Sequence, residues 1–183
     1  FMTVVAVNRE LRKRNFYTLE LPEPNLMQWL DLVALGTVCD VVTLLGINRA
    51  FVTQGLKIMA QRQNLGLKTL MDSPDEADKP NIADAPTFAN TKKPLINEKL
   101  DTYHLGFILG PRINACGRVG KASTGSKLLC STNPIEAEFL TSEMNAYNKE
   151  RKDIECFVLQ QAIEILEGTP QAWPMAFVAS KGW

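Results

Sequence analysis

Residues 109–121 combine side chains that bind anions with residues that break regular structure. The stretch LGPRINACGRVGK contains three glycines, a proline, an asparagine and three cations, and an apolar run precedes it. Glycines allow backbone N–H groups to approach a ligand closely, and the planar guanidinium of arginine matches two phosphate oxygens at once. The pattern predicts a shaped loop that binds an anion such as phosphate. A tight turn with solvated arginines is the alternative.

A single carboxylate stands in an apolar run upstream of this stretch. Asp40 is the charged residue in the middle of residues 37–46, which are otherwise nearly all apolar. A buried carboxylate without a partner is strongly unfavourable, so Asp40 is expected to meet a helix N-terminus, a cation or a metal ion. Capping of the next segment and metal ligation are therefore both open at this residue.

The composition limits which functions the chain can have. Its 183 residues contain 20 Lys and Arg and 20 Asp and Glu, so any binding of nucleic acid must come from a local patch. The four cysteines show no CxxC spacing, which argues against a zinc site and a redox pair and suits a reducing compartment. The sequence contains no run of about 18 apolar residues, so it predicts no membrane span. We expect a cytoplasmic protein.

Helical periodicity and capping residues predict the elements that position these groups. Helices are expected over residues 1–15, 26 to about 36, 48–62, 100–109 and 122–130. Asn25 can cap the second helix, whose buried face is predicted to include Trp29, and Gly55 in the third suggests a close helix contact. The basic residues at the end of the first helix are interpreted as partners of its dipole rather than as a nucleic-acid contact. His104, the only histidine, is interpreted as a structural hydrogen-bonding group.

A long helix is predicted in the C-terminal third. Asn133 and Pro134 form a start signal, and the helix can run unbroken to Glu167 and end at Gly168, a length on the order of 50 Å. A polar break at residues 148–153 divides its apolar face, so we expect a connector between domains that is packed at both ends and exposed midway. Residues 175–179 then predict the first strand of a second domain. Residues 72–98, rich in Pro, Asp and Asn, predict an exposed insertion.

Three stretches of the sequence resemble the RecJ family of exonucleases within the DHH phosphoesterase superfamily. Residues 30–42, LDLVALGTVCDVV, look like the fourth motif of that family, and residues 105–118, LGFILGPRINACGR, resemble its LGPRxNAxGR motif. Residues 148–151, NKER, are similar to its interdomain helix, and Gly182-Trp183 stands where a GWHPGV-like motif would begin. The resemblance covers nearly the whole chain apart from residues 72–98.

The resemblance implies roles for six residues. Asp40 corresponds to an aspartate that binds the catalytic Mn²⁺ or Mg²⁺, and Arg112 and Arg118 to cations that hold phosphates of the DNA strand. Asn114 would help to shape their loop, and Gly110 and Gly117 would supply its backbone freedom. Hydrolysis of a phosphodiester needs a metal-activated water and neutralised phosphoryl oxygens, which agrees with these roles.

The resemblance also implies an architecture and an activity. The fold class expected is α/β, as a mostly helical fragment: the C-terminal part of a DHH domain at 1–130, a connector helix at 131–168, and the start of a DHH-associated domain at 172–183. The intact protein would digest single-stranded DNA from its 5′ end in recombination and repair. It would be a monomer, with single-stranded DNA, a single-strand-binding protein and a helicase as partners. No DHH triplet occurs, so we expect the fragment alone to be inactive.

Two other functions are weighed against this one. The first is a DHH phosphoesterase that acts on short oligonucleotides or cyclic dinucleotides. The second is a helical interaction module without enzymatic activity, which an Asp40 exposed to solvent would favour.

Overall fold

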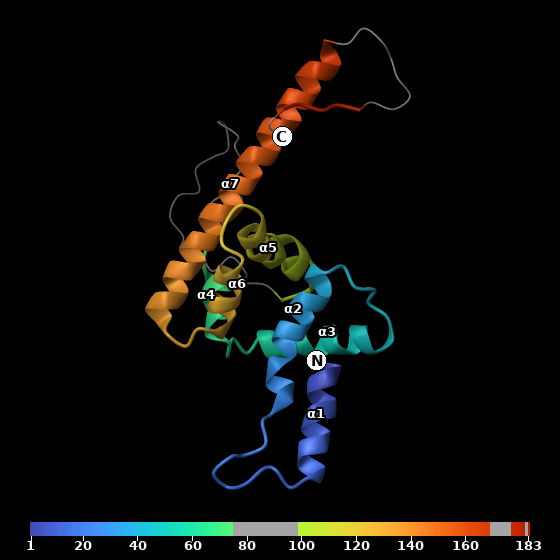
Figure 1. The fold of residues 1–183 in the computed structure, drawn as a ribbon, viewed down its shortest axis with the longest axis vertical. Coiled ribbons are helices and arrows are strands. Elements are labelled where there is room, and N and C mark those ends of the chain that lie inside the picture. The colour runs from blue at the N-terminus through green and yellow to red at the C-terminus, as the bar shows by residue number, and fades with distance from the viewer. Residues whose placement is uncertain (75–98, 169–176, 182) are drawn as a thin grey trace.

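The computed structural model describes residues 1–74, 99–168, 177–181 and 183, and Figure 1 shows these as an assembly of helices. The described residues contain no strand, so the expectation of a mostly helical chain is confirmed. The α-helices, in chain order, are α1 (Met2–Lys13), α2 (Leu30–Cys39), α3 (Gly46–Met59), α4 (Leu65–Asp72), α5 (Gly110–Arg118), α6 (Ser123–Cys130) and α7 (Pro134–Glu167). A 3₁₀ turn, Leu26–Trp29, precedes α2, and a π-helical turn, His104–Leu109, runs into α5.

Helices α2 and α3 cross at a point where only glycine fits. A Cβ atom added to Gly55 would lie 2.1 Å from the carbonyl oxygen of Leu30 and 2.5 Å from the Cβ of Ala34. Both distances are far below van der Waals contact, so the absence of a side chain allows the two helices to touch. The close helix contact expected at Gly55 is therefore confirmed.

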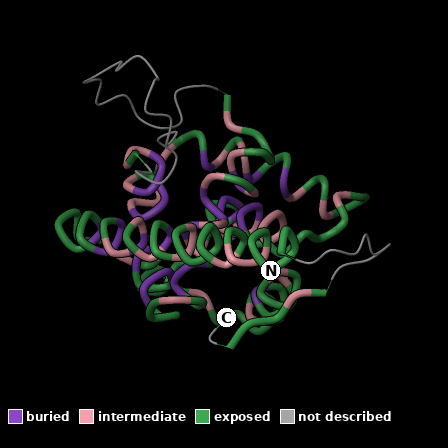
Figure 2. Tube along the Cα trace, turned by 90° about the horizontal axis from the view of Figure 1, so that it is seen from above, coloured by how far each residue is buried: buried purple, intermediate pink, exposed green. Residues whose placement is uncertain are grey.

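The core lies between α2, α3, α4, the π-helical turn, α5, α6 and the first half of α7. Figure 2 shows these buried stretches, in purple, gathered in the interior of the molecule. The largest apolar side chains in it are Leu30, Met59, Leu67, Leu70, Met71, Leu105, Leu109, Leu128 and Met144, all at most 1% exposed. Helix α1 lies outside this core and buries only Asn8.

Helix α7 has the predicted ends. The Asn133 side chain accepts a hydrogen bond from the backbone N–H of Ile135 at 3.0 Å, Pro134 occupies the first turn, and Gly168 follows the last residue. Its first half packs on α4, α5 and α6, whereas its second half extends beyond them (Figure 1). Apolar side chains of that second half, such as Phe157, are exposed. The packing expected at the N-terminal end is confirmed, whereas packing of the far end on a second domain stays a prediction. The middle is partly buried, because Asn148 lies in the core.

Several other expectations need correction. Residues 109–121 are largely helical rather than a loop, because Pro111 sits in the first turn of α5, where proline is tolerated. Trp29 is exposed, and α2 continues past Gly36 to Cys39. The described part of the expected strand, residues 177–179, pairs with no other strand; residues 175–176 and 75–98, most of the expected insertion, lie outside the described residues.

The sequence predicts no membrane-spanning segment, and the described helices can be compared with that prediction. None of them combines the length and the apolar character that crossing a bilayer requires.

A candidate nucleic-acid interface

Four elements line a small pocket at the C-terminal end of α2. The pocket has a volume of about 190 Å³. Its walls are Cys39 of α2, Gly106 of the π-helical turn, Gly110, Pro111, Asn114 and Arg118 of α5, and Arg151 of α7. Residues 106, 110, 114 and 118 follow one another at four-residue steps, so they share one face of a continuous helical segment. We call this hollow the arginine pocket.

The polar groups of the arginine pocket suit an anion. Arg118 and Asn114 are exposed one turn apart on α5, and Arg118 forms no ion pair with any described residue. Arg151 adds a second guanidinium from α7, and no carboxylate is among the described residues that line the walls. The forked N–H donors of arginine match the oxygens of a phosphate.

Gly110 brings the end of α2 against α5. A Cβ atom at this position would lie 2.8 Å from both the Cys39 sulfur and the carbonyl oxygen of Leu105. The residue has no positive φ, so its role is close packing rather than the backbone freedom that the sequence suggested. A Cβ at Gly117 would meet nothing within 4 Å, and neither packing nor an unusual φ requires glycine there.

The Cys39 thiol lines the pocket in its protonated form. Burial, together with the negative charge of the neighbouring Asp40, raises the pKa of Cys39 to about 11. The thiol lies 3.7 Å from the carbonyl oxygen of Leu105 and can donate a weak hydrogen bond to it. Cys39 is therefore an inert wall rather than a nucleophile at neutral pH.

Asp40 is exposed, at the residue that follows the last turn of α2. The expectation of a carboxylate buried in an apolar run is wrong, because the chain leaves the helix here through Val41, which has a φ of 54° and is 89% exposed. Asp40 is one residue from Cys39 and so stands beside the arginine pocket. The described residues contain no group of three or more His, Cys, Asp or Glu side chains that could hold a metal ion.

Arg112 is buried on another face of α5. Its guanidinium has no exposed surface; Nε donates to Asn145 Oδ1 at 2.8 Å and Nη1 to the carbonyl oxygen of Leu70 at 2.7 Å. It thereby ties α5 to α7 and α4. Sequence reasoning placed Arg112 with Arg118 on a phosphate, whereas the structure separates the two. Asn145 was not foreseen, because it lies 33 residues away and no local pattern marks it.

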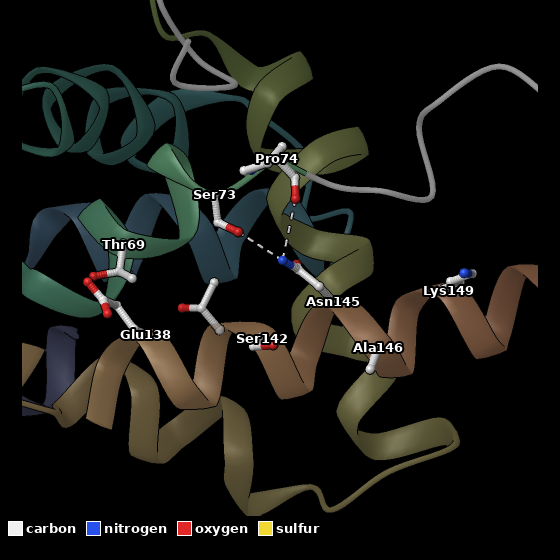
Figure 3. A pocket seen from close by; sticks show the side chains of 9 residues that line it. Thr69, Ser73, Pro74, Glu138, Ser142, Asn145, Ala146 and Lys149 are labelled. Atoms are coloured by element: carbon white, nitrogen blue, oxygen red, sulfur yellow. Dashed lines mark hydrogen bonds between the residues drawn. The ribbon is translucent and has the colours of Figure 1, made fainter. Parts of the chain in front are cut away.

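A second, larger hollow lies between α4 and α7. Its volume is about 610 Å³, and Figure 3 shows its walls: Thr69, Ser73, Pro74, Glu138, Thr141, Ser142, Asn145, Ala146 and Lys149. Asn145 Nδ2 donates to Ser73 Oγ at 2.9 Å, so the amide that holds Arg112 also fixes the end of α4 (Figure 3). We call it the hydroxyl groove. Its described walls include no arginine.

The other charged candidates form local contacts. Arg12 forms an ion pair with Glu23, and Lys13 and Arg14 form ion pairs with Glu10. These cations at the end of α1 are therefore paired with nearby carboxylates. His104 Nδ1 lies 2.6 Å from Asp101 Oδ1, and this hydrogen bond lowers the pKa of Asp101. His104 thus has the structural hydrogen-bonding role that the sequence predicted.

No protein-family model matches the chain, but individual proteins of known sequence do. The single-stranded-DNA-specific exonuclease RecJ of Dickeya dadantii is 35% identical over 169 residues, and that of Salmonella typhimurium is 36% identical over 169 residues. Each alignment covers 91% of this chain and 26% of the relative, so the chain spans about a quarter of the length of these relatives.

Solved structures agree with the sequence comparison. RecJ of Thermus thermophilus in complex with Mn²⁺ superimposes with a TM-score of 0.59 and 29% identity, covering 80% of this chain and 19% of that one. The complex of the same protein with Mg²⁺ also gives a TM-score of 0.59, covering 85% of this chain and 20% of that one. Over about nine tenths of its length, the chain is therefore similar to RecJ exonucleases in sequence, and over 80% of it in structure.

Proposed function

We propose that this chain is part of a metal-dependent exonuclease that acts on single-stranded DNA, and that its arginine pocket holds a phosphate of the strand. The observation that carries the proposal is the arrangement around Arg118. The exposed Arg118 and Asn114 line a pocket whose walls also include Cys39, the residue beside Asp40. The relatives named single-stranded-DNA-specific exonucleases support the choice of substrate.

Asp40 would supply one ligand to Mn²⁺ or Mg²⁺, the ions present in the related structures. An exposed carboxylate fits these hard cations, which prefer oxygen ligands. One carboxylate does not make a site, so the remaining ligands would come from outside the described residues. The bound ion would supply an activated water and neutralise phosphoryl charge. Arg118 and Asn114 would hold the neighbouring phosphate in place.

The wider proposal follows the family resemblance. Residues 1–130 would belong to the DHH domain, 131–168 to the connector and 172–183 to the DHH-associated domain. The whole protein would digest DNA in the 5′ to 3′ direction during recombination and repair, as a cytoplasmic monomer that meets a single-strand-binding protein and a helicase. The chain alone would be inactive, because it would carry only one of several metal ligands.

Arg118→Ala in the full-length protein tests the phosphate contact. We expect weaker binding of an oligothymidylate by fluorescence anisotropy, and a plot of log affinity against log salt that is shallower by about 0.7 for each phosphate that the protein no longer neutralises. Arg49→Ala removes an exposed arginine from α3, outside the arginine pocket, and serves as the control. An affinity and salt slope that change no more than in this control would contradict the proposal.

A helical interaction module without enzymatic activity is the second candidate, favoured by the exposure of Asp40. Asp40→Asn in the full-length protein separates the two. An exonuclease should lose Mn²⁺-dependent release of nucleotides while still binding the oligothymidylate. Unchanged nuclease activity in this variant would show that Asp40 is not a metal ligand. An absence of activity in the unaltered protein would favour the interaction module.

A further inference from the structure

We infer that Arg151 of α7 is a second phosphate-binding residue of the arginine pocket, so that one phosphodiester group of the strand is held jointly by α5 and α7. This inference rests on the proposed function and extends it to a residue outside the LGPRxNAxGR motif. In the sequence, Arg151 belongs to the polar break of the long helix and to the NKER stretch that resembles the interdomain helix, and neither assigns it a phosphate contact.

The position of Arg151 is the first observation. It lines the same hollow as Arg118 and Asn114 but comes from a different helix. Its side chain is 21% exposed, so most of its aliphatic stem is packed while part of the side chain remains accessible. Two guanidinium groups thus reach one pocket from two elements that pack against each other.

The second observation is that Arg151 is held in place before any ligand binds. Its Nε donates to Oδ1 of Asn148 at 3.3 Å, and its Nη1 donates to Oε2 of Glu155 at 2.7 Å. Asn148 is only 1% exposed, so its amide is a fixed point in the core. A side chain that is already ordered loses less conformational entropy when it binds.

The ion pair with Glu155 does not prevent binding of an anion. The Glu155 side chain is 70% exposed, and exposed ion pairs contribute little free energy. A phosphate in the pocket would meet two guanidinium groups, whereas Glu155 interacts with one. The carboxylate therefore orients Arg151 without competing strongly for it.

The size and charge of the pocket define the ligand class. A volume of about 190 Å³ accommodates a phosphate group with its ester oxygens more readily than a whole nucleotide. Two forked donors can each contact two oxygens, which suits the two non-bridging oxygens of a phosphodiester. The ligand is accordingly the backbone of the strand rather than a base.

The test compares four variants of the full-length protein: Arg118→Ala, Arg151→Ala, the double variant and Lys149→Ala. Lys149 is the matched control, because it is a cation on α7 two residues from Arg151 but lines the hydroxyl groove. We expect Arg151→Ala to weaken oligothymidylate binding about tenfold, as removal of a charge-assisted hydrogen bond does, and to lower the salt slope by about 0.7. Lys149→Ala should change neither quantity.

The double variant tests whether the two arginines hold one phosphate. A shared phosphate predicts a decrease in affinity that is clearly not the product of the two single decreases. A strictly multiplicative decrease would overturn the shared site. If Arg118→Ala weakens binding and Arg151→Ala does not, the inference fails and the proposed function stands; if neither does, both fail.

Arg151→Lys keeps the inference testable should Arg151→Ala fold poorly. Lysine retains the charge but loses the planar fork. We expect binding weaker than that of the unaltered protein with the salt slope preserved, at an unchanged thermal unfolding midpoint. Wild-type affinity in this variant would overturn a role for the guanidinium geometry.

Discussion

The Nε atom of Arg112 donates a hydrogen bond to Oδ1 of Asn145 at 2.8 Å, inside a protein interior where the arginine has no exposed surface. This bond joins α5 to α7, and the carbonyl oxygen of Leu70 joins the same guanidinium to α4. A buried cation is destabilised when an acceptor of its N–H groups is removed. The arginine of the LGPR sequence therefore fixes the position of the helix that presents Arg118.

Asn145→Ala should destabilise the protein. Removing the amide takes an acceptor from a buried cation and also breaks the bond to Ser73, which we expect to cost about 3 kcal/mol in the free energy of unfolding, measured by urea titration. Asn114→Ala, an exposed asparagine on α5, should change that free energy by less than about 0.5 kcal/mol. Equal effects of the two variants would show that Arg112 does not depend on Asn145.

Gly55→Ala should disrupt the contact between α2 and α3. Because the new Cβ would lie 2.1 Å from the Leu30 carbonyl oxygen, the helices must separate, at a cost of about 3 kcal/mol or more. Gly36→Ala is the matched control: its Cβ would meet nothing within 4 Å, and alanine should stabilise α2 by about 0.5–1 kcal/mol. Thermal unfolding of both variants measures the contrast, and a lower midpoint for Gly36→Ala would contradict it.

Thr141→Val should stabilise the protein slightly. Thr141 is 2% exposed, and its hydroxyl has no hydrogen-bond partner among the described residues. Replacing it with a methyl group of similar size removes the cost of burying a polar atom, a gain of about 1 kcal/mol. Thr124→Val should do the opposite, because the Thr124 hydroxyl donates to Glu143 at 3.3 Å. Urea titration that shows the same sign for both variants would refute this interpretation.

The cysteines should react with a thiol reagent in two classes. Cys130 and Cys156 are exposed, whereas burial raises the pKa of both Cys39 and Cys116. Iodoacetamide at pH 8 should therefore label the first pair before the second, as mass spectrometry of peptides would show. Rapid labelling of Cys39 in the folded protein would mean that the end of α2 opens readily.

The Cys39 thiol should make the free energy of unfolding decrease at alkaline pH. Cys39 has a pKa of about 11 in the folded chain and 9.0 without that environment. The stability linked to its neutral form is fully present below about pH 9 and is lost as the pH rises towards 11, because only the unfolded chain ionises in that window. Cys39→Ser should flatten the alkaline decline of the unfolding free energy between those values. An equally steep decline in that variant would assign it to other groups.

Local signals in the sequence were sufficient for the long helix. Asn133 and Pro134 start α7 and Gly168 follows it, because caps depend on neighbours within one turn. The glycines of residues 109–121 led to the wrong prediction of a loop, because the role of Gly110 depends on a residue that is distant in the sequence. Gly110 is needed where α2 approaches α5, and that contact depends on Cys39, far away in the sequence. A glycine required for packing and a glycine required for a turn look alike in a sequence.

The candidate site was only partly predictable for a similar reason. The motif identified Arg118 and Asn114, both of which line the arginine pocket. It also grouped Arg112 with them, although residues 112 and 118 stand on different faces of one helix once the segment is helical rather than a loop. Arg151 was not singled out, because its relation to the motif arises only from the packing of α7 on α5.

Helix α7 carries both Asn145, which secures the motif arginine, and Arg151, which lines the pocket. Since 34 residues form one continuous helix, a tilt imposed on its projecting end turns both residues together about the packed half. A force applied to the projecting end of the helix would therefore move Arg151, and with it the phosphate that we propose binds there, without direct contact at the arginine pocket.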